Sequence, residues 1–352
     1  MEGSFPGFGP LCKVGKRWLA LSGRTPALPC TSGFHEFDVG LAERPLPRFE
    51  LGLGGGVLEI RAVQSAAGYR IVRLANGAHS VHSLAHHETF HPVVGPVAEA
   101  EALYVRQLSL VERLQHHTGE FVLWDVGLGA AANALTALRA TREIPCAIHL
   151  LSFDHTLDPL VFALQHREVL GYLGGYEPHL ERLLHDRHCA FRHGPQTVKW
   201  DMHLADFPTL LTQPAARKLA KPHVIMFDAF SPASNPAMWT LPLFSDLFRL
   251  LAPDRPCALP TYSRSTMLRV TLLLAGFHVG VGHATGEKEE TTIAANTPAL
   301  ITEPLDRRWL QRAHRSTSAE PLWEPIYRQA RLSPASWEKL QQHPQFHSMT
   351  SA

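Results

Sequence analysis

The sequence of 352 residues predicts an α/β fold in which helices alternate with the strands of a doubly wound parallel sheet. Three features support this prediction. Short apolar runs of strand length end at or beside carboxylates, as at Asp125, Asp154 and Asp228. Segments with helical spacing separate these runs, which is typical of βαβ units. The first run leads into a glycine-containing turn that opens a helix, as at nucleotide-binding sites.

The elements can be assigned in order along the chain. Alternating runs broken by glycine predict a small antiparallel meander over 48–74, and apolar spacing predicts a helix over 99–116. The βα repeat follows, with strands predicted at 121–126, 148–153, 199–205, 224–228, 256–262, 278–281 and 291–295. Helices are predicted at 130–142, 158–170, 207–211, 240–251 and 265–275, the last with Gly276 as its C-cap.

This pattern divides the chain into four segments. We expect residues 1–46, rich in glycine and proline, to be poorly ordered. An N-terminal β subdomain with a linking helix is predicted at 47–120, and the main sheet domain at 121–300. Residues 301–352 form a mildly basic C-terminal extension.

Composition limits the class of protein. The chain is 45% hydrophobic and 18% charged, and its net charge is +1, which neither requires nor excludes a nucleic-acid partner. Its five cysteines are scattered without a C-x-x-C pair, which argues against zinc or a disulfide scaffold and suits a reducing cytosol. No apolar run approaches the ~20 residues of a membrane span, and the N-terminus does not resemble a secretory signal. We therefore expect a cytoplasmic protein without a membrane segment.

The stretch from Val224 to Trp239 carries the clearest chemical signal. Its apolar run predicts a buried parallel strand that ends at Asp228, at the edge where open α/β sheets bind ligands. Phe230 and the prolines Pro232 and Pro236 follow, so the loop is stiff. A carboxylate on a stiff loop beside an aromatic ring is suited to holding an amine. The alternative is a strand that simply ends in a capped turn.

The turn after the first strand predicts a nucleoside cofactor. Gly127 and Gly129 let the backbone turn tightly and approach a ligand, while Ala132 stands where a third glycine is common. This turn alone does not separate NAD from S-adenosylmethionine. Asp154, after the second strand, is the acid expected to hold a ribose diol. Asp206, after the third, either contacts an adenine amino group or caps the next helix.

A histidine-rich segment also contains possible metal ligands. Five histidines lie between His79 and His91, with Glu88 among them. The segment lacks the helical H-x-x-x-H context of many zinc sites, and histidine is frequent throughout this chain. We therefore predict a polar loop here and no metal.

Several of these stretches together resemble a known family. Asp228–Trp239 is similar to the motif D-[AG]-F-[SA]-P-x-x-N-P-x-M-W of the methyltransferase domain of the bifunctional tRNA-modifying protein MnmC and its stand-alone relatives. The turn from Asp125 to Gly129, followed by Asn133, resembles the family's acidic-x-G-x-G-x-x-x-N. Further similarity lies in Phe90-His91 with Gly95, Glu99 or Glu101 and Tyr104-Val105, and in Leu274–Phe277 with Gly286–Glu290. The resemblance spans roughly residues 49–300.

The resemblance implies a class I Rossmann-like methyltransferase sheet with a small N-terminal antiparallel β subdomain. It implies S-adenosyl-L-methionine as cofactor and the wobble uridine of the tRNA anticodon loop as substrate, methylated on its 5-aminomethyl nitrogen, with or without a 2-thio group. Asp228 is then the catalytic residue, holding the amine and helping to remove its proton. The residues implied at the cofactor are Asp125, Gly127, Gly129, Asp154 and Asp206. Those implied at the substrate are Phe230, Ser231, Pro232, Asn235 and Lys288. Phe230 is suited either to stacking on the wobble base or to the core.

The sequence also departs from the family. Ala130 and Ala131 replace the usual Thr and Gly of the cofactor turn, and Glu289 replaces a basic residue after Lys288. Without a second G-x-G-x-x-G region, we expect no oxidoreductase domain, so another enzyme would make the aminomethyl group. The alternatives are a methyl- or aminopropyltransferase on a small amine, a flavin or NAD dehydrogenase, and a catalytically idle RNA-binding relative.

Overall fold

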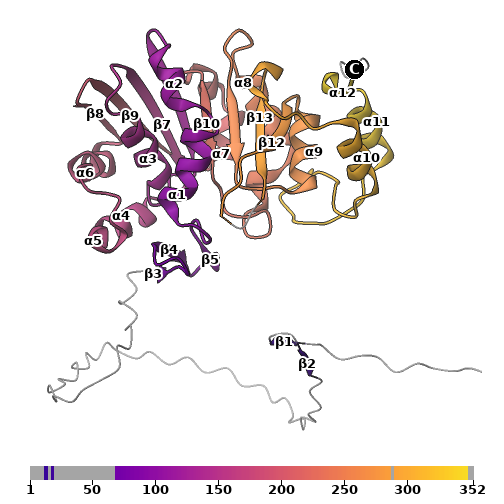
Figure 1. The fold of residues 1–352 in the computed structure, drawn as a ribbon, viewed down its shortest axis with the longest axis horizontal. Helices are drawn as coiled ribbons and strands as arrows, with labels where there is room; N and C mark the ends of the chain where they lie inside the picture. Colours follow the sequence, from indigo (N-terminus) through magenta and orange to yellow (C-terminus); the bar gives the residue numbers. More distant parts are fainter. Residues whose placement is uncertain (1–11, 15–16, 20–67, 287–288, 348–352) are drawn as a thin grey trace, which may run out of the picture. The chain divides into compact units, whose positions relative to one another are not determined.

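The computed structural model describes residues 12–14, 17–19, 68–286 and 289–347 (Figure 1). The chain divides into two units, Met1–Glu59 and Ile60–Ala352. In the first unit, strand β1 (Cys12–Val14) pairs antiparallel with β2 (Arg17–Leu19). Apart from these two strands, the segment predicted to be poorly ordered and the beginning of the predicted meander lie outside the described residues.

A small antiparallel sheet opens the described part of the second unit. Its strands are β3 (Tyr69–Arg73), β4 (His79–Ser83) and β5 (Glu88–Thr89), with β4 in the middle. The prediction of a polar loop throughout 79–91 is therefore wrong for β4 and β5. The buried residues of β4 are Ser80, Val81 and Ser83, so the alternation of apolar residues that identifies most strands is absent.

The main sheet has eight strands in the order β12-β13-β11-β10-β6-β7-β9-β8 (Figure 1). Its five central strands are parallel, as predicted: β11 (Ala258–Thr261), β10 (Val224–Phe227), β6 (Glu120–Val126), β7 (Ala147–Asp154) and β9 (Gln196–Leu204). Both edges are antiparallel. They consist of β12 (His278–Gly282) with β13 (Thr291–Ala295), and of β8 (His188–His193), which the sequence analysis missed.

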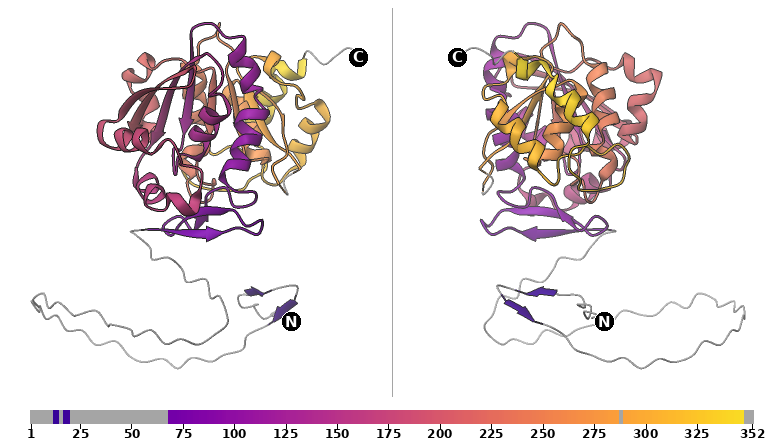
Figure 2. Two further views of the ribbon diagram at one scale, coloured as in Figure 1. Left: turned by 60° about the vertical axis from the view of Figure 1, so that its left-hand side comes forward. Right: turned by 90° about the vertical axis from the view of Figure 1, so that its right-hand side faces the viewer.

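Alternating side chains of the central strands pack against helices on both faces. Leu123 and Met226 lie in one apolar cluster, and Trp124 and Ile225 lie in the other, as the two-residue period of a strand requires. The first face packs against α3 (Ala132–Ala140), α4 (Asp158–Gln165), α5 (Arg167–Leu170) and α6 (Glu177–Asp186). The second packs against α7 (Phe207–Thr212), α8 (Leu241–Leu250) and α9 (Thr266–Ala275) (Figure 2). The predicted class I methyltransferase-like sheet is confirmed in this arrangement.

The helix predicted at 99–116 is divided into three pieces. Helix α1 (Pro96–Ala100) runs into a π-helical turn, Glu101–Arg106, and α2 (Leu110–Gln115) begins after Ser109, whose φ is 45°. Isolated π-helical turns are common at functional sites. This one carries Tyr104, whose hydroxyl donates a hydrogen bond of 3.4 Å to the carbonyl of Phe227, the residue before Asp228.

The C-terminal residues pack onto the second face of the sheet. Helices α10 (Arg307–Arg315), α11 (Pro334–Gln341) and α12 (Pro344–His347) contribute Leu310, Leu340 and Phe346 to its apolar cluster. The amide of Gln345 bonds both backbone groups of Val279. Among the described residues, no helix is long and apolar enough to cross a membrane.

Candidate active site

Three strand ends meet at the carboxyl edge of the parallel sheet. Val126, the last residue of β6, is aligned with Phe227 of β10 on one side and with Phe153 of β7 on the other. Gly127, Asp154 and Asp228 each follow or end these strands, so the register alone brings them together. Together they border a cavity of about 820 Å³, a size typical of small-molecule sites.

The turn after β6 exposes its backbone to this cavity because its glycines have no side chains. Gly127 has φ 93°, and a Cβ atom there would lie 2.7 Å from the carbonyl oxygen of Asp228. The amide of Gly129 donates a 3.0 Å hydrogen bond to Oδ2 of Asp154, which ties the turn to the end of β7. Ala131 adopts φ 62°, a left-handed conformation that costs a non-glycine residue about 1 kcal/mol or more.

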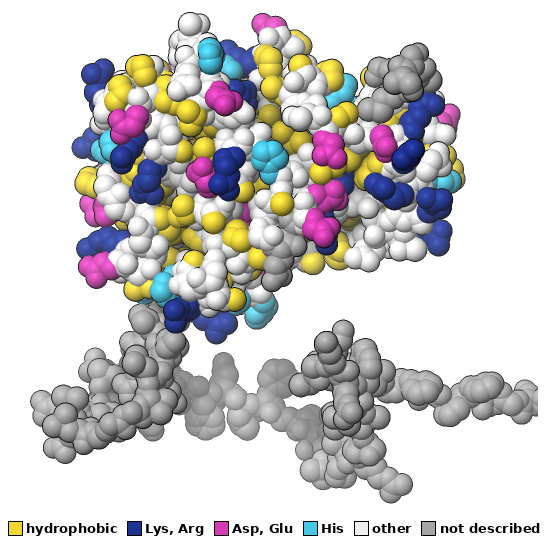
Figure 3. Space-filling model, in the orientation of Figure 1, with side chains coloured by type: hydrophobic (Ala, Val, Ile, Leu, Met, Phe, Trp, Pro, Cys, Tyr) yellow, Lys and Arg dark blue, Asp and Glu magenta, His cyan; other side chains and the backbone are white. Residues whose placement is uncertain are grey.

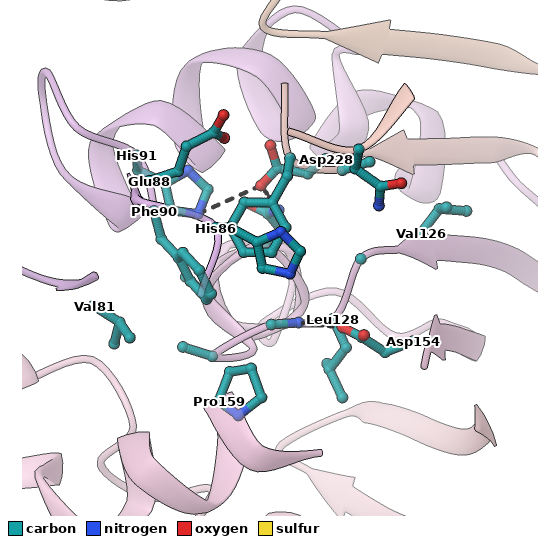
Figure 4. Close-up of a pocket in the computed structure, with 18 of the residues that line it drawn as sticks. Val81, His86, Glu88, Phe90, His91, Val126, Leu128, Asp154, Pro159 and Asp228 are labelled. Carbon is teal, nitrogen blue, oxygen red and sulfur yellow. Dashed lines mark hydrogen bonds and ion pairs between the residues drawn. The ribbon is translucent and has the colours of Figure 1, made fainter. Parts of the chain in front are cut away.

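Asp228 is held by side chains from two other elements (Figure 4). The amide of Asn133, on α3, donates a 2.7 Å hydrogen bond to its Oδ2, and Nε2 of His91 lies 3.4 Å from the same oxygen. The second ring nitrogen of His91 lies 3.7 Å from Oε1 of Glu99 on α1. The side chains of Glu99, His91 and Asp228 are only 4%, 7% and 15% exposed, so solvent screens their charges weakly.

Burial and nearby carboxylates raise the pKa of two groups close to the cavity, Tyr104 and Asp125. Burial and then the charges of Asp228 and Glu99 raise the pKa of Tyr104 well above its ordinary value, so its phenol stays neutral. Burial raises the pKa of Asp125 to about 7, against the effect of its hydrogen bond from Ser152. Asp125 is fully buried and does not line the cavity, so its carboxylate influences the site by electrostatics and not by direct contact.

The other residues expected at the cofactor do line the cavity. Asp154 accepts hydrogen bonds from the amides of Gly129 and His155, and the imidazole of His155 lies 3.2 Å from its Oδ1. Asp206 caps α7 by accepting a 3.0 Å hydrogen bond from the amide of Thr209, one of its two predicted roles. It also borders the cavity, and its contact with an adenine stays a prediction.

Phe230 on the opposite wall lies within an aromatic cluster. Its ring stacks on His86 at 4.2 Å and meets the edge of Phe90 at 5.4 Å. Glu88 ties the same loop to β5, since its carboxylate accepts hydrogen bonds from the hydroxyls of Ser231 and Ser234. Burial alone would raise the pKa of Glu88, but these hydrogen bonds outweigh it and hold the pKa below its ordinary value.

The remaining residues expected at the substrate are placed differently. Asn235 and Ser231 line the cavity, whereas Pro232 does not. Lys288 lies outside the described residues. The sequence analysis left Glu99 and Glu101 as alternatives, and it is Glu99 that faces His91.

His91, Glu99 and Asp228 form a set that the sequence analysis did not assemble. One oxygen or nitrogen atom from each lies within 4.8 Å of the others, close enough in principle to hold a metal ion. The two ring nitrogens of His91 face different carboxylates, however, so the ring bridges the pair as a proton carrier can. His91 and Glu99 are eight residues apart, whereas Asp228 comes from a distant part of the chain, so no single stretch of the sequence indicated the set.

Comparison with known proteins finds similarity to methyltransferases. A family described as S-adenosyl-L-methionine-dependent methyltransferase matches residues 180–297. The protein named tRNA 5-methylaminomethyl-2-thiouridine biosynthesis bifunctional protein MnmC from Methylibium petroleiphilum is 29% identical over 67% of this chain and 35% of its own length. The protein of that name from Ectopseudomonas mendocina is 30% identical over 53% of this chain and 29% of its own. Over these residues the chain is similar to S-adenosyl-L-methionine-dependent methyltransferases and resembles part of the MnmC proteins.

A solved structure supports the same fold. The crystal structure of MNMC2 from Aquifex aeolicus has a TM-score of 0.55 to this chain at 21% identity, covering 79% of this chain and 84% of that one. The chain spans about a third of the length of the curated MnmC relatives that it matches. The family description gives S-adenosyl-L-methionine as the cofactor.

The residues of the site fit that cofactor. Gly127 and Gly129 leave backbone where a Cβ atom would meet Asp228 or Phe90, so only glycine keeps the turn close to the cavity. Asp154 presents a carboxylate at the end of β7, where a nucleoside hydroxyl can be bound. The donor set therefore suits a nucleoside with a ribose.

Proposed function

We propose that this chain methylates the primary amine of a 5-aminomethyl group on the wobble uridine of tRNA. The observation that carries the proposal is the position of Asp228, which faces the cavity beside the glycine turn and is held by Asn133 and His91. The similarity to proteins named for tRNA 5-methylaminomethyl-2-thiouridine biosynthesis supports the tRNA substrate. We expect the activity in the cytoplasm.

The cofactor half of the site is assigned to the glycine turn. We expect Gly127, Gly129 and Asp154 to hold S-adenosyl-L-methionine, with Asp206 beside its base. When bound, it supplies an electrophilic methyl group, whose transfer forms an N–C bond as an S–C bond breaks. The turn contributes bare backbone N–H and C=O groups, and Asp154 accepts from ribose hydroxyls.

Asp228 prepares the amine for this transfer. An aminomethyl group is protonated at neutral pH and must lose a proton before its lone pair can attack. The carboxylate of Asp228 accepts that proton, while the Asn133 amide fixes the carboxylate rotamer. His91 lies between Asp228 and Glu99, so the proton can move from Asp228 to the imidazole and be stabilised there by the second carboxylate.

The aromatic cluster of Phe230, His86 and Phe90 supplies a surface for the nucleobase. Bases of single-stranded RNA loops can be splayed out and stacked on aromatic side chains. Glu88 fixes the Phe230 loop through Ser231 and Ser234, so this surface is rigid before the substrate arrives.

The test is methyl transfer from labelled S-adenosyl-L-methionine to tRNA that carries 5-aminomethyluridine. The expected product is 5-methylaminomethyluridine, identified by mass spectrometry of the digested tRNA. The free modified nucleoside and tRNA without the aminomethyl group serve as controls. Equal turnover of the free nucleoside would replace tRNA by a small amine as the substrate. Cofactor binding without transfer to any of these amines would overturn the proposed activity.

A further inference from the structure

Residues 319–330 form a closed loop whose base is fixed and whose tip is open. The amide of Ala319 donates a 2.8 Å hydrogen bond to the carbonyl of Ala330, which joins the two ends of the loop. Glu320 lies under the base and accepts hydrogen bonds from the hydroxyls of Ser333 and Ser336. Compact loops with joined ends are frequently functional. We refer to residues 319–330 as the aromatic loop.

The tip of the aromatic loop presents three large apolar side chains to solvent. Trp323, Ile326 and Tyr327 are 51%, 52% and 41% exposed, and the first two are the most exposed large apolar residues among those that the structure describes. Isolated exposed apolar residues are ordinary, but three within five positions on a fixed loop indicate an interaction surface.

The aromatic loop is attached to the segment that lines the cavity. Its Leu322 is buried and forms a parallel bridge with Thr240, and its carbonyl accepts a 2.8 Å hydrogen bond from the amide of Leu241. Thr240 lies two residues beyond Met238, which lines the cavity. In Figure 1 the chain between α10 and α11 runs along the lower edge of the domain, the edge toward which the β3–β5 sheet also lies.

An arginine-rich helix face precedes this loop. Arg308, Arg312 and Arg315 are spaced i, i+4 and i+7 on α10, so they share one exposed face, while Trp309, Leu310 and Ala313 point into the core. Residues 306–331 contain six arginines and three acids, a net charge of +3 in a chain whose total is +1. Figure 3 shows Lys and Arg side chains gathered over α10 and α11. We refer to Arg308, Arg312 and Arg315 as the arginine face.

An exposed arginine also lies near the cavity. Arg264 is two residues from Tyr262, which lines the cavity. Arg269 adds no surface charge, because it is buried and its guanidinium lies 3.2 Å from the carboxylate of Glu290.

We propose that the arginine face and the aromatic loop bind the body of the tRNA while its wobble nucleotide occupies the cavity. The arginine face contacts backbone phosphates, and Trp323 and Tyr327 stack on unpaired bases or riboses. A protein partner is disfavoured because arginines on both sides of exposed aromatic rings match the phosphates and bases of RNA. This inference rests on the proposed tRNA substrate.

The test compares tRNA binding by the full chain and two double variants. Dissociation constants are measured by fluorescence anisotropy with labelled tRNA at several salt concentrations. R312Q/R315Q is expected to bind about tenfold more weakly and to reduce the salt slope by roughly 0.7–0.9 for each phosphate that it no longer neutralises. W323A/Y327A is expected to bind about tenfold or more weakly with an unchanged salt slope. R182Q/R192Q, on exposed positions of α6 and β8, and V161A/V169A are the matched controls.

Each outcome decides the inference. Selective weakening of tRNA binding in the two test variants, with wild-type affinity for S-adenosyl-L-methionine and unchanged melting temperature, supports it. Wild-type tRNA affinity in both test variants overturns this surface and leaves the proposed substrate intact. A wild-type chain that binds no tRNA overturns the proposed substrate itself. If W323A/Y327A instead changes only self-association, the loop is a protein contact and the inference is wrong.

Discussion

Nε2 of His91 lies 3.4 Å from Oδ2 of Asp228, while Nδ1 of the same ring lies 3.7 Å from Oε1 of Glu99. One imidazole therefore lies between two carboxylates that are only 4% and 15% exposed. Two such carboxylates repel each other strongly in a weakly screened site, and a proton on the ring between them relieves that repulsion. The arrangement suits a site that must take a proton from a cationic amine and keep it.

We predict different reductions in rate for the members of this set. Asp228→Asn removes the proton acceptor and is expected to lower kcat by about 10²–10⁴-fold. His91→Gln leaves Asp228 in place without a carrier and is expected to lower kcat by about tenfold, with little change in KM. Single-turnover methyl transfer across pH 6–9 measures both. The exposed His116→Gln is the control, and a wild-type rate in the His91 variant would show that Asp228 needs no partner.

Replacing Asp154 and replacing Asp125 are predicted to lower the affinity for S-adenosyl-L-methionine by different amounts. Asp154 lines the cavity, and its replacement by Ala is expected to weaken S-adenosyl-L-methionine binding by about tenfold or more, the cost of a hydrogen bond to a charged group. Asp125 is buried behind the turn and bonds Ser152, so Asp125→Asn is expected to cost less than about tenfold. Calorimetric titration distinguishes them. Equal reductions in affinity would mean that Asp125 contacts the cofactor.

Gly127 is predicted to tolerate no side chain. At φ 93°, Gly127→Ala is strained, and its Cβ atom would meet the Asp228 carbonyl at 2.7 Å, so the catalytic loop must shift. A displacement of about 1 Å at reacting groups can cost 10²-fold in rate. Gly171→Ala is the matched control, because Gly171 has φ 74° and nothing within 4 Å of an added Cβ. Similar activity in the two variants would contradict the crowding argument.

The sequence predicted the parts of the site that one local segment encodes. The strand that ends at Asp228 and the turn at Gly127 and Gly129 each carry their signal within about ten residues, and parallel strand order then brings them together. Asp206 could be predicted only as two alternatives, because a cap and a ligand contact need the same residue type at the same place.

The contacts that the sequence could not predict join distant segments. Nothing near Ser231 in the chain indicates that its hydroxyl donates a hydrogen bond to Glu88, and nothing near Asn133 indicates Asp228. The strand β8 was missed because its alternating polar residues lie at an exposed sheet edge, where no apolar run is needed. Such positions depend on tertiary packing rather than on local pattern.

We expect the protonation of His223 to make the stability of the fold depend on pH. Its Nδ1 accepts a 2.9 Å hydrogen bond from the amide of Val122, and its ring stacks on Phe121 at 4.5 Å. Burial, followed by the positive charges of Arg255 and other neighbours, lowers its pKa to about 4 from an ordinary value of 6.5. Between these two pH values the unfolded chain binds a proton that the folded chain does not, so stability must fall as the pH is lowered.

The expected decrease from His223 is about 3 kcal/mol in the free energy of unfolding between pH 7 and pH 4. Asn in place of His223 keeps an acceptor near Val122 but cannot titrate, so His223→Asn is expected to be less stable at pH 7 and to have a shallower pH dependence. Urea unfolding at intervals from pH 4 to pH 8 measures the difference between variant and wild type. That difference isolates His223 from the similarly buried His343, whose pKa is also lowered to about 4 and which both proteins retain. His185→Asn, at an exposed position, should leave the curve unchanged. Parallel pH curves for wild type and His223→Asn would mean that His223 takes up its proton at the same pH in the folded and the unfolded protein, so that its surroundings in the fold do not lower its pKa.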